Sequence, residues 1–310
     1  MDDQSHAEAA DLTAGCLALA APRFELVPLR GMRELAGALP AGATVTVTCS
    51  PRHGLERTLE AAEALTADGF RTVPHLAARL VRDRADLQRI LDRLAAAGIR
   101  ECFVVGGDEN RPLGSYAGGV ELLEAMASMA PRPDVVGVPA YPEGHPRLSE
   151  QALQRALDIK AGLADYAVTQ MCFEPERVRS WLQRQRERGM WLPVFAGLPG
   201  VMERRRLIMI AMKIGLGPST RALTRQRGLL GRLMQQGVYR PDDLIWQLAP
   251  LVGPVGTHGL AGFHINTFNQ VADTRGWLEE IHSAYCHWHG VDLAGGGTAP
   301  GQVPVEQPSG

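Results

Sequence analysis

The sequence lacks the features that mark membrane proteins and nucleic-acid-binding proteins. No apolar run approaches the ~18 residues that a membrane-spanning helix needs. The charge is nearly balanced, with 32 Lys and Arg against 34 Asp and Glu, so there is no basic surplus of the kind that nucleic-acid binders carry. Aromatic residues make up only 5% of the chain, but 45% of it is hydrophobic, which is typical of a folded protein. We expect neither a membrane nor a nucleic acid as partner.

Paired cysteines are also lacking. The cysteines are odd in number and form no CxxC pair, which is typical of reduced thiols in the cytoplasm: Cys16, Cys49, Cys102, Cys172 and Cys286. Residues 13–16 resemble a lipoprotein processing site, but the acidic stretch before them has no apolar core, which argues against a signal peptide. A histidine-rich group near the C-terminus matches no zinc-ligand spacing: His282, Cys286, His287 and His289. We predict a cytoplasmic protein without a metal site.

Short strand patterns and helix patterns alternate along the chain. Eight segments are rich in β-branched or aromatic residues: 24–27, 44–48, 72–75, 102–105, 135–138, 166–169, 192–195 and 262–265. Most are followed by an amphipathic helix pattern, such as the apolar residues at helical spacing within 87–94. The length alone leaves open two domains of ~150 residues or one barrel of ~250. Strict alternation predicts parallel strands, and eight units favour an α/β fold with a single (β/α)8 TIM barrel.

The ends of the chain differ from its middle in composition. We predict an N-terminal helix within residues 1–20, a barrel domain over 21–290 with extra helices within 216–250, and a disordered tail over 291–310. The tail is rich in Gly, Pro and Gln and has almost no apolar residues. Ser149 is a suitable N-cap, and Pro175 suits the first turn of a helix.

Polar residues collect where the predicted strands end, and in such a barrel reacting groups lie at the carboxyl ends of the strands. Glu25 and Gln170 are each a single polar group within an apolar segment, so burying them needs a compensating partner. The other strand ends carry, in chain order, Thr48, His75, Gly106-Gly107-Asp108, Tyr141 to His145, Gly197 to Pro199, and Asn266 to Asn269.

Several of these segments together resemble the methylenetetrahydrofolate reductase family. They are the Ala-Tyr-Pro-Glu-Gly-His-Pro run at 140–146, Gly107-Asp108, the segment from Ala164 to Phe173, and Phe263-His264 with Asn269. The resemblance runs in register from about Phe24 to Asn269. It implies an eight-stranded β/α barrel that reduces 5,10-methylenetetrahydrofolate to 5-methyltetrahydrofolate with NADH or NADPH and usually a bound FAD.

The resemblance also implies roles for individual residues. Glu25 matches the general acid that protonates folate N10, so that the ring opens to an iminium that accepts hydride. A pocket of low polarity beside Phe24 and Leu26 would raise the pKa of such a carboxyl. Asp108 matches the aspartate near flavin and pterin, and Gln170 matches the glutamine that binds folate. The flavin-contacting positions are Thr48, His75, Tyr141 and His145.

The sequence departs from the family pattern where the flavin phosphates bind. Gly106 replaces an arginine, and two adjacent basic positions hold Asp158 and Ile159. The phenylalanine that stacks on the substrate ring falls near Met209, which we assign to the substrate site. A diphosphate without its cations would bind poorly. Either FAD binds weakly, through contacts such as Arg147, Arg155 or Lys160, or hydride passes directly from the nicotinamide, which we slightly favour.

Other interpretations stay open at this point. The barrel could reduce a different one-carbon carrier, or the chain could be a folate-binding or regulatory paralogue without turnover. The presence of Glu25 argues against the second, since a binding module needs no buried acid. Arg204-Arg205-Arg206 is either a solvated helix face or a contact for folate glutamates or a cofactor phosphate.

Overall fold

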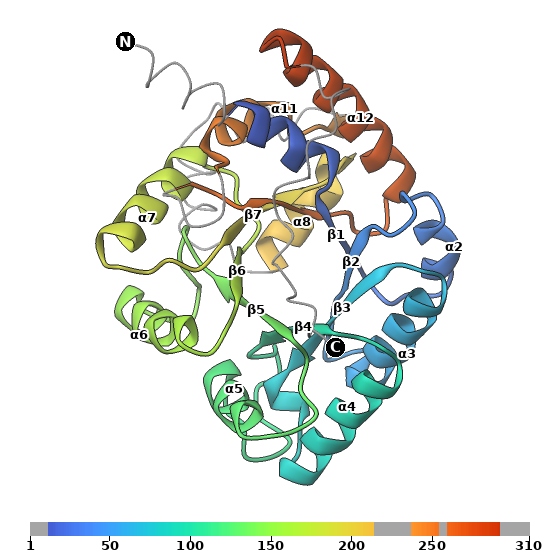
Figure 1. Cartoon of the computed structure of the whole chain (residues 1–310), viewed down its shortest axis with the longest axis vertical. Helices are drawn as coiled ribbons and strands as arrows, with labels where there is room; N and C mark the ends of the chain where they lie inside the picture. The colour runs from blue at the N-terminus through green and yellow to red at the C-terminus, as the bar shows by residue number, and fades with distance from the viewer. Residues whose placement is uncertain (1–11, 214–236, 254–258, 292–310) are drawn as a thin grey trace, which may run out of the picture.

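Eight parallel strands close into a barrel, which confirms the predicted fold class (Figure 1). The computed structural model describes residues 12–213, 237–253 and 259–291. Around the barrel the order is β1-β10-β7-β6-β5-β4-β3-β2. The strands are β1 (Arg23–Leu26), β2 (Thr44–Val47), β3 (Arg71–Ala77), β4 (Glu101–Val105), β5 (Val135–Ala140), β6 (Tyr166–Thr169), β7 (Val194–Pro199) and β10 (Gly262–Asn266).

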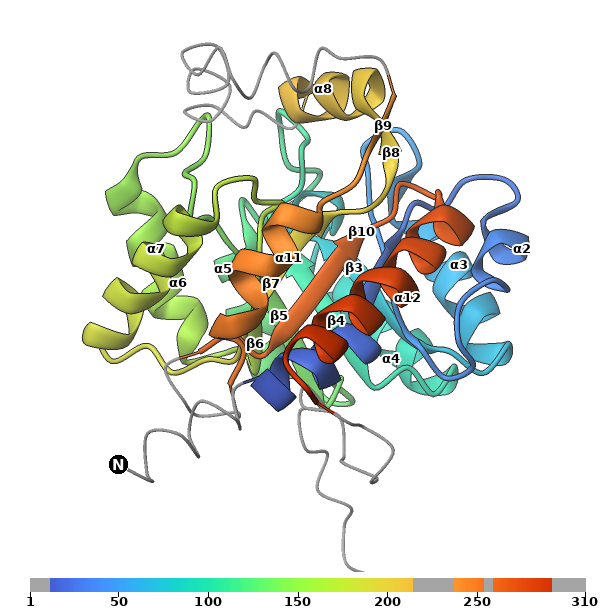
Figure 2. The ribbon, with the colours of Figure 1, turned by 90° about the horizontal axis from the view of Figure 1, so that it is seen from above.

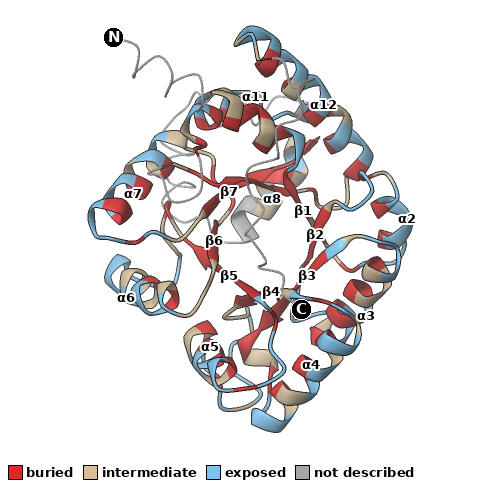
Figure 3. Cartoon of the chain, in the orientation of Figure 1, coloured by how far each residue is buried: buried red, intermediate tan, exposed pale blue. Residues whose placement is uncertain are grey.

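Helices surround the barrel and bury its outer face, so the strands are almost wholly buried (Figure 3). They are α2 (Met32–Ala36), α3 (Gly54–Ala67), α4 (Arg84–Ala96), α5 (Gly119–Ala127), α6 (Glu150–Ala161), α7 (Pro175–Glu187), α11 (Asp242–Leu248) and α12 (Val271–Trp288). A further helix, α8 (Arg204–Lys213), is not part of this outer layer. Short 3-10 turns, η1 (Ala78–Leu80) and η2 (Ala249–Leu251), follow β3 and α11. None of the described helices is long and apolar enough to cross a membrane.

The local signals read from the sequence explain where helices begin. The Ser149 side chain accepts a hydrogen bond from the Ala152 amide and caps α6, as predicted. Pro175 occupies the first turn of α7, also as predicted. The apolar stripe of α4 is buried against the barrel, and each such leucine or isoleucine contributes roughly 1.5–3 kcal/mol by leaving water.

The inside of the barrel carries a buried charge cluster near the amino ends of the strands. Arg23 donates to the Glu101 carboxylate and, at 2.8 Å, to the Tyr166 hydroxyl. Its guanidinium carbon lies 4.5 Å from the Tyr166 ring centroid and 5.1 Å from that of Phe195. We call Arg23, Glu101, Tyr166 and Phe195 the floor cluster. Gly137 leaves room for it, because a Cβ there would lie 2.2 Å from the Tyr166 ring.

Both ends of the described chain pack on the amino side of the barrel. Residues 12–20 are helical, and Cys16 forms a disulfide with Cys286 of α12, their Cα atoms 5.7 Å apart. The prediction that all cysteines are reduced is therefore wrong for this pair, which folding brings together across 270 residues of sequence. Residues 1–11 and 292–310, which include nearly all of the predicted tail, lie outside the described residues, as do residues 216–236 of the predicted extra helices. The domain bounds stay predictions.

Two further features bear on the carboxyl end of the barrel and on its outer wall. Helix α8 lies above the carboxyl end, joined to a small antiparallel pair, β8 (Met202–Glu203) and β9 (Val238–Tyr239), that the sequence analysis missed (Figure 2).

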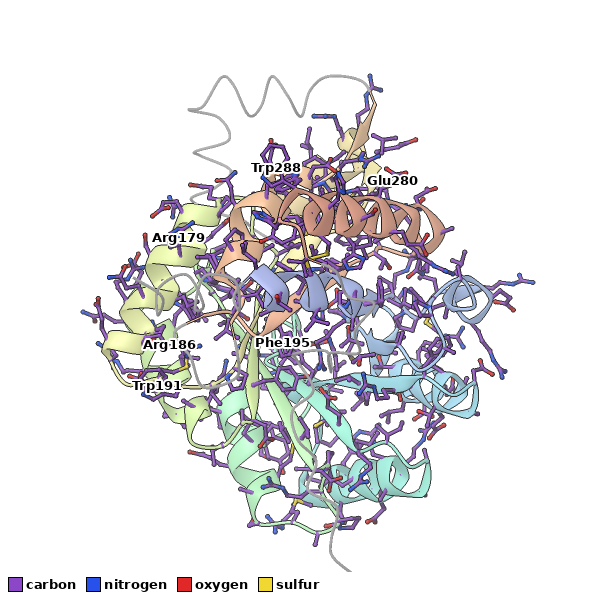
Figure 4. The ribbon with its side chains drawn as sticks, turned by 45° about the horizontal axis from the view of Figure 1, so that its top comes forward. Arg179, Arg186, Trp191, Phe195, Glu280 and Trp288 are labelled. Carbon is purple, nitrogen blue, oxygen red and sulfur yellow. A yellow bond between two sulfur atoms is a disulfide. The ribbon has the colours of Figure 1, made fainter. Side chains whose placement is uncertain are left out.

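On the outer wall of the barrel, Arg186 of α7 donates to the carbonyls of Met190, Leu192 and Gly259. Its guanidinium lies beside the Trp191 ring (Figure 4). Arg186 thus ties the end of α7 to the starts of β7 and β10.

Candidate active site

Glu25 lies inside the barrel with two histidines. The side-chain period of a strand is two, so Glu25 shares the inner face of β1 with Arg23, one step nearer the carboxyl end. Glu25 Oε2 lies 3.1 Å from Nε2 of His264 on β10 and 3.8 Å from Nε2 of His75 on β3. The His75 ring packs against Phe103, with ring centroids 4.8 Å apart. We call Glu25, His75 and His264 the acid cluster.

The acid cluster reverses one expectation about Glu25. Burial does raise the pKa of Glu25, but the hydrogen bond to His264 and the charges of His264 and His75 outweigh it, so its pKa is lowered. Sequence reasoning placed only Phe24 and Leu26 beside the carboxyl and expected a raised pKa. Burial lowers the pKa of His75 to about 4, against the opposing effect of Glu25. His75 is therefore neutral near pH 7.

Hydrogen bonds from the loop after β10 to the backbone at the end of β1 hold that strand end in place. Thr267 donates to the Glu25 carbonyl through both its amide, at 3.2 Å, and its hydroxyl, at 2.7 Å. The Asn269 side chain accepts from the Val27 amide and donates to the Val27 carbonyl, both at 2.9 Å. Phe268 and Asn269 have φ angles of 47° and 65°, a conformation that non-glycine residues seldom adopt. This segment therefore positions Glu25, a role that sequence reasoning missed.

A second polar group lies on the rim formed by the loops after β4 and β5. The Asp108 side chain is 80% exposed, and its Oδ1 lies 3.8 Å from an Arg147 guanidinium nitrogen. Tyr141 and His145 pack edge to face with ring centroids 5.2 Å apart. Burial, with a smaller contribution from the Asp108 charge, raises the pKa of Tyr141 to about 12. Asp108, Tyr141, His145 and Arg147 are therefore neighbours at the rim, whereas Glu25 and His75 lie inside the barrel.

The remaining predicted residues lie at other points of the carboxyl end. Thr48 and Gln170 directly follow β2 and β6, and both are half-buried. The backbone amide of Gln170 donates to the Ala140 carbonyl at 2.7 Å. The Gln170 side chain makes no hydrogen bond to the described part of the chain. His75 lies within β3, which runs to Ala77, two residues further than predicted, so it is deeper than a strand end.

The glutamate of the Tyr-Pro-Glu segment has a structural role that sequence reasoning did not assign. Glu143 is 5% exposed and accepts hydrogen bonds from the amides of Phe173, at 2.8 Å, and Glu174, at 2.9 Å. It thereby ties the loop after β5 to the loop that follows Gln170. A buried carboxylate with two backbone donors is a fixed anchor, which explains its place in a distinctive motif.

Met209 lies on α8, and its assignment to the substrate site stays a prediction. Its side chain is 60% exposed. The neighbouring Leu207 is buried in a cluster with Met171 and Met202, against which Phe173 and Phe268 pack. The Arg206 guanidinium donates to the Phe268 carbonyl at 3.3 Å, so this arginine fixes α8 over the barrel. The apolar face of α8 toward the barrel is thus carried by Leu207, two residues before Met209.

Comparison with known proteins identifies the family. The profile of the methylenetetrahydrofolate reductase family matches residues 28–215, more than half of the 310 residues. The chain belongs to the methylenetetrahydrofolate reductase family. Two solved structures are also similar. A proposed lyase/mutase from Burkholderia cenocepacia J2315 has 13% identity and a TM-score of 0.45 over 92% of this chain and 90% of that one. Dihydropteroate synthase (FolP) from Thermus thermophilus has 16% identity and a TM-score of 0.40 over 86% and 95%.

The family implies FAD, but the residues at the phosphate positions do not fit a diphosphate. Asp158 accepts from Gln154 at 2.8 Å and pairs with Arg188 at 3.4 Å. Ile159 is 45% exposed. Both lie in the last turn of α6, which runs antiparallel to the strands and so ends near their amino ends. Lys160, one suggested substitute, is buried with Nζ 3.5 Å from the Pro139 carbonyl. These positions therefore offer a diphosphate no exposed cation.

Proposed function

We propose that this chain reduces 5,10-methylenetetrahydrofolate to 5-methyltetrahydrofolate, taking hydride directly from NADH or NADPH. The observation that carries the proposal is the acid cluster, an ionisable carboxyl inside the barrel with a histidine 3.1 Å away, in a member of this family. The reaction needs one proton and one hydride. A buried carboxyl coupled to an imidazole is suited to deliver the proton at neutral pH.

In the proposed reaction Glu25 gives its proton to folate N10. The bond between N10 and the bridging carbon breaks, its electron pair stays on N10, and the bridging carbon becomes an iminium on N5. The C4 hydride of the nicotinamide then adds to that carbon and leaves NAD(P)+. Direct transfer requires only that the two rings are aligned.

The other predicted residues supply binding in this proposal. The Gln170 amide can donate to and accept from the pterin edge, because its side chain makes no bond to the described part of the chain. Asp108 and Tyr141 at the rim provide polar contacts for the pterin or the nicotinamide ribose. The apolar cluster under α8, which includes Leu207 and Phe268, gives a surface on which a flat ring can pack.

Two alternatives remain, and each has its own observation. Reduction of a different one-carbon carrier on the same barrel is compatible with the exposed rim at Asp108. A folate-binding paralogue without turnover is compatible with the low pKa of Glu25, since a permanently ionised carboxylate cannot act as an acid. The hydrogen bond to His264 argues against this second alternative, because it gives the carboxylate a proton donor.

The test combines a spectrum with an assay. Purified protein should show no flavin absorbance and should oxidise NADH or NADPH only when methylenetetrahydrofolate is added, with methyltetrahydrofolate as product. A yellow preparation that loses activity when its flavin is removed would refute direct transfer. Folate binding without oxidation of either nucleotide would favour the binding paralogue.

A further inference from the structure

The two histidines face the Glu25 carboxylate unequally. Nε2 of His264 is within hydrogen-bond distance of Oε2, at 3.1 Å, whereas Nε2 of His75 lies at 3.8 Å and has no hydrogen-bond partner within the described residues. The Glu25 side chain is 18% exposed, and those of His264 and His75 are 3% and 9% exposed. Glu25 is therefore the most exposed member of the cluster.

Within the described residues, His264 is the titratable group at hydrogen-bond distance from the Glu25 carboxylate. In the part of the chain that the structure describes, His75 from β3 and His264 from β10 face Glu25, and the charge of Arg23 on β1 acts on His75. Arg23 is already paired with Glu101 and bonded to Tyr166. His75 is neutral near pH 7, because burial lowers its pKa to about 4. On β2, the Thr46 hydroxyl donates to the Phe24 carbonyl and adds no charge.

The other ring nitrogen of His264, Nδ1, offers no second path for proton exchange. Nδ1 of His264 is buried and has no hydrogen-bond partner in the described part of the chain. A proton on His264 therefore exchanges through Nε2 and the Glu25 carboxylate.

We propose that His264 is the proton store for Glu25, so that the pair holds one mobile proton between Nε2 and Oε2. This deepens the proposed reduction and rests on it. The Nε2–H bond of His264 breaks as an O–H bond forms on Glu25. That O–H bond then breaks as an N–H bond forms on folate N10, which leaves both side chains without the mobile proton. The pair takes a new proton from water through Glu25 before the next turnover. His75 is a neutral neighbour that limits the space around the carboxylate.

The first test uses the free enzyme and does not depend on turnover. Nitrogen chemical shifts of the histidine rings, measured by NMR between pH 4 and 9 on labelled protein, report which ring carries protons at both nitrogens. We expect the protonation state of the His264 ring to change in Glu25→Gln, and His75 to stay neutral until about pH 4. A neutral His264 throughout that range would overturn the proposal, whether or not the chain reduces folate.

The second test separates storing a proton from holding Glu25 in place. His264→Gln puts an amide nitrogen near the position of Nε2, so it can still donate to Glu25 but cannot release a proton. We expect kcat to fall about 10²- to 10⁴-fold with little change in KM, and the alkaline limb of the pH profile to move at least about one unit lower. His287→Asn, at an exposed position of α12, should leave kcat unchanged. A His264→Gln enzyme with the wild-type kcat and pH profile would contradict the proposal.

Discussion

Two buried carboxylates in the same barrel have opposite surroundings. The Glu101 side chain of the floor cluster is 21% exposed and the Glu25 side chain of the acid cluster is 18% exposed, so burial does not distinguish them. Glu101 pairs with Arg23, a permanent cation. Glu25 instead faces two imidazoles, a side-chain type that carries no permanent charge.

The difference in partner separates a structural role from a chemical one. Burial lowers the pKa of Arg23, but Tyr166 and Glu101 outweigh it, so its pKa is raised and Arg23 keeps its charge at any ordinary pH. In the acid cluster, by contrast, we propose that a proton moves between Glu25 and His264, whose Oε2 and Nε2 atoms lie 3.1 Å apart. One strand, β1, carries both residues two positions apart, so a single strand supplies a fixed charge below and a titratable one above.

The largest effect is expected from a substitution in the acid cluster. Glu25→Gln keeps the size of the side chain but removes the transferable proton, so kcat should fall about 10²- to 10⁴-fold. Folate affinity, measured by calorimetry, should stay within a few fold. Glu101→Gln provides the matched control, and its kcat should stay far closer to wild type in the fraction that folds. Full activity of Glu25→Gln would remove the basis for the mechanism.

The second largest effect is expected from a substitution in the floor cluster. Arg23→Met leaves the Glu101 charge unpaired inside the barrel, which should lower the free energy of unfolding by about 3–5 kcal/mol. Arg93→Met removes an ion-paired arginine at the surface, bonded to Glu56 and Glu63, and should cost about 1 kcal/mol or less. Urea denaturation measures both. Equal losses in the two variants would show that the floor cluster contributes no more than a surface pair.

A third prediction concerns acid. His75 has its ordinary pKa of 6.5 in the unfolded chain but a pKa of about 4 in the folded one. The free energy of unfolding should therefore fall as the pH drops from about 6.5 to about 4, because the unfolded chain binds the proton more readily. The loss from this group between pH 7 and pH 5 should be roughly 2 kcal/mol, at 1.36 kcal/mol per pKa unit. His75→Asn should lack this loss. If denaturation curves show the same acid dependence for both proteins, His75 is charged in the folded state.

The smallest effect concerns the loop that holds Glu25. Thr267→Val removes the hydroxyl that donates to the Glu25 carbonyl and keeps a similar shape. It should cost about 1 kcal/mol of stability, measured by thermal unfolding, and lower kcat only a few fold. A loss of activity as large as that of Glu25→Gln would mean that the loop itself takes part in the chemistry.

The fold followed from the sequence because strand and helix patterns alternate eight times, a local signal. The capping roles of Ser149 and Pro175 are equally local and were predicted correctly. Glu25 was identifiable as one polar residue in an apolar strand. Its altered pKa was not, since the partner His264 lies 239 residues away and on another strand.

The disulfide was not predicted for the same reason, because it depends on contacts that exist only in the folded chain. The pairing of Cys16 with Cys286 depends on packing the N-terminal helix against α12. Met209 was assigned by counting along the family pattern, and that assignment stays a prediction, but on α8 it is Leu207 that packs with Met171 and Met202. A helix turns by about 100° per residue, so a shift of two positions moves a side chain to another face.

The central claim is best tested by following the hydride itself. Methylenetetrahydrofolate is incubated with NADH carrying two deuterium atoms at C4, and the mass of the methyltetrahydrofolate formed is measured. Direct transfer between the two bound substrates predicts one deuterium in nearly every product methyl group, while the proton that Glu25 delivers to N10 comes from water. A product without deuterium, or no product with either nucleotide, would contradict the account.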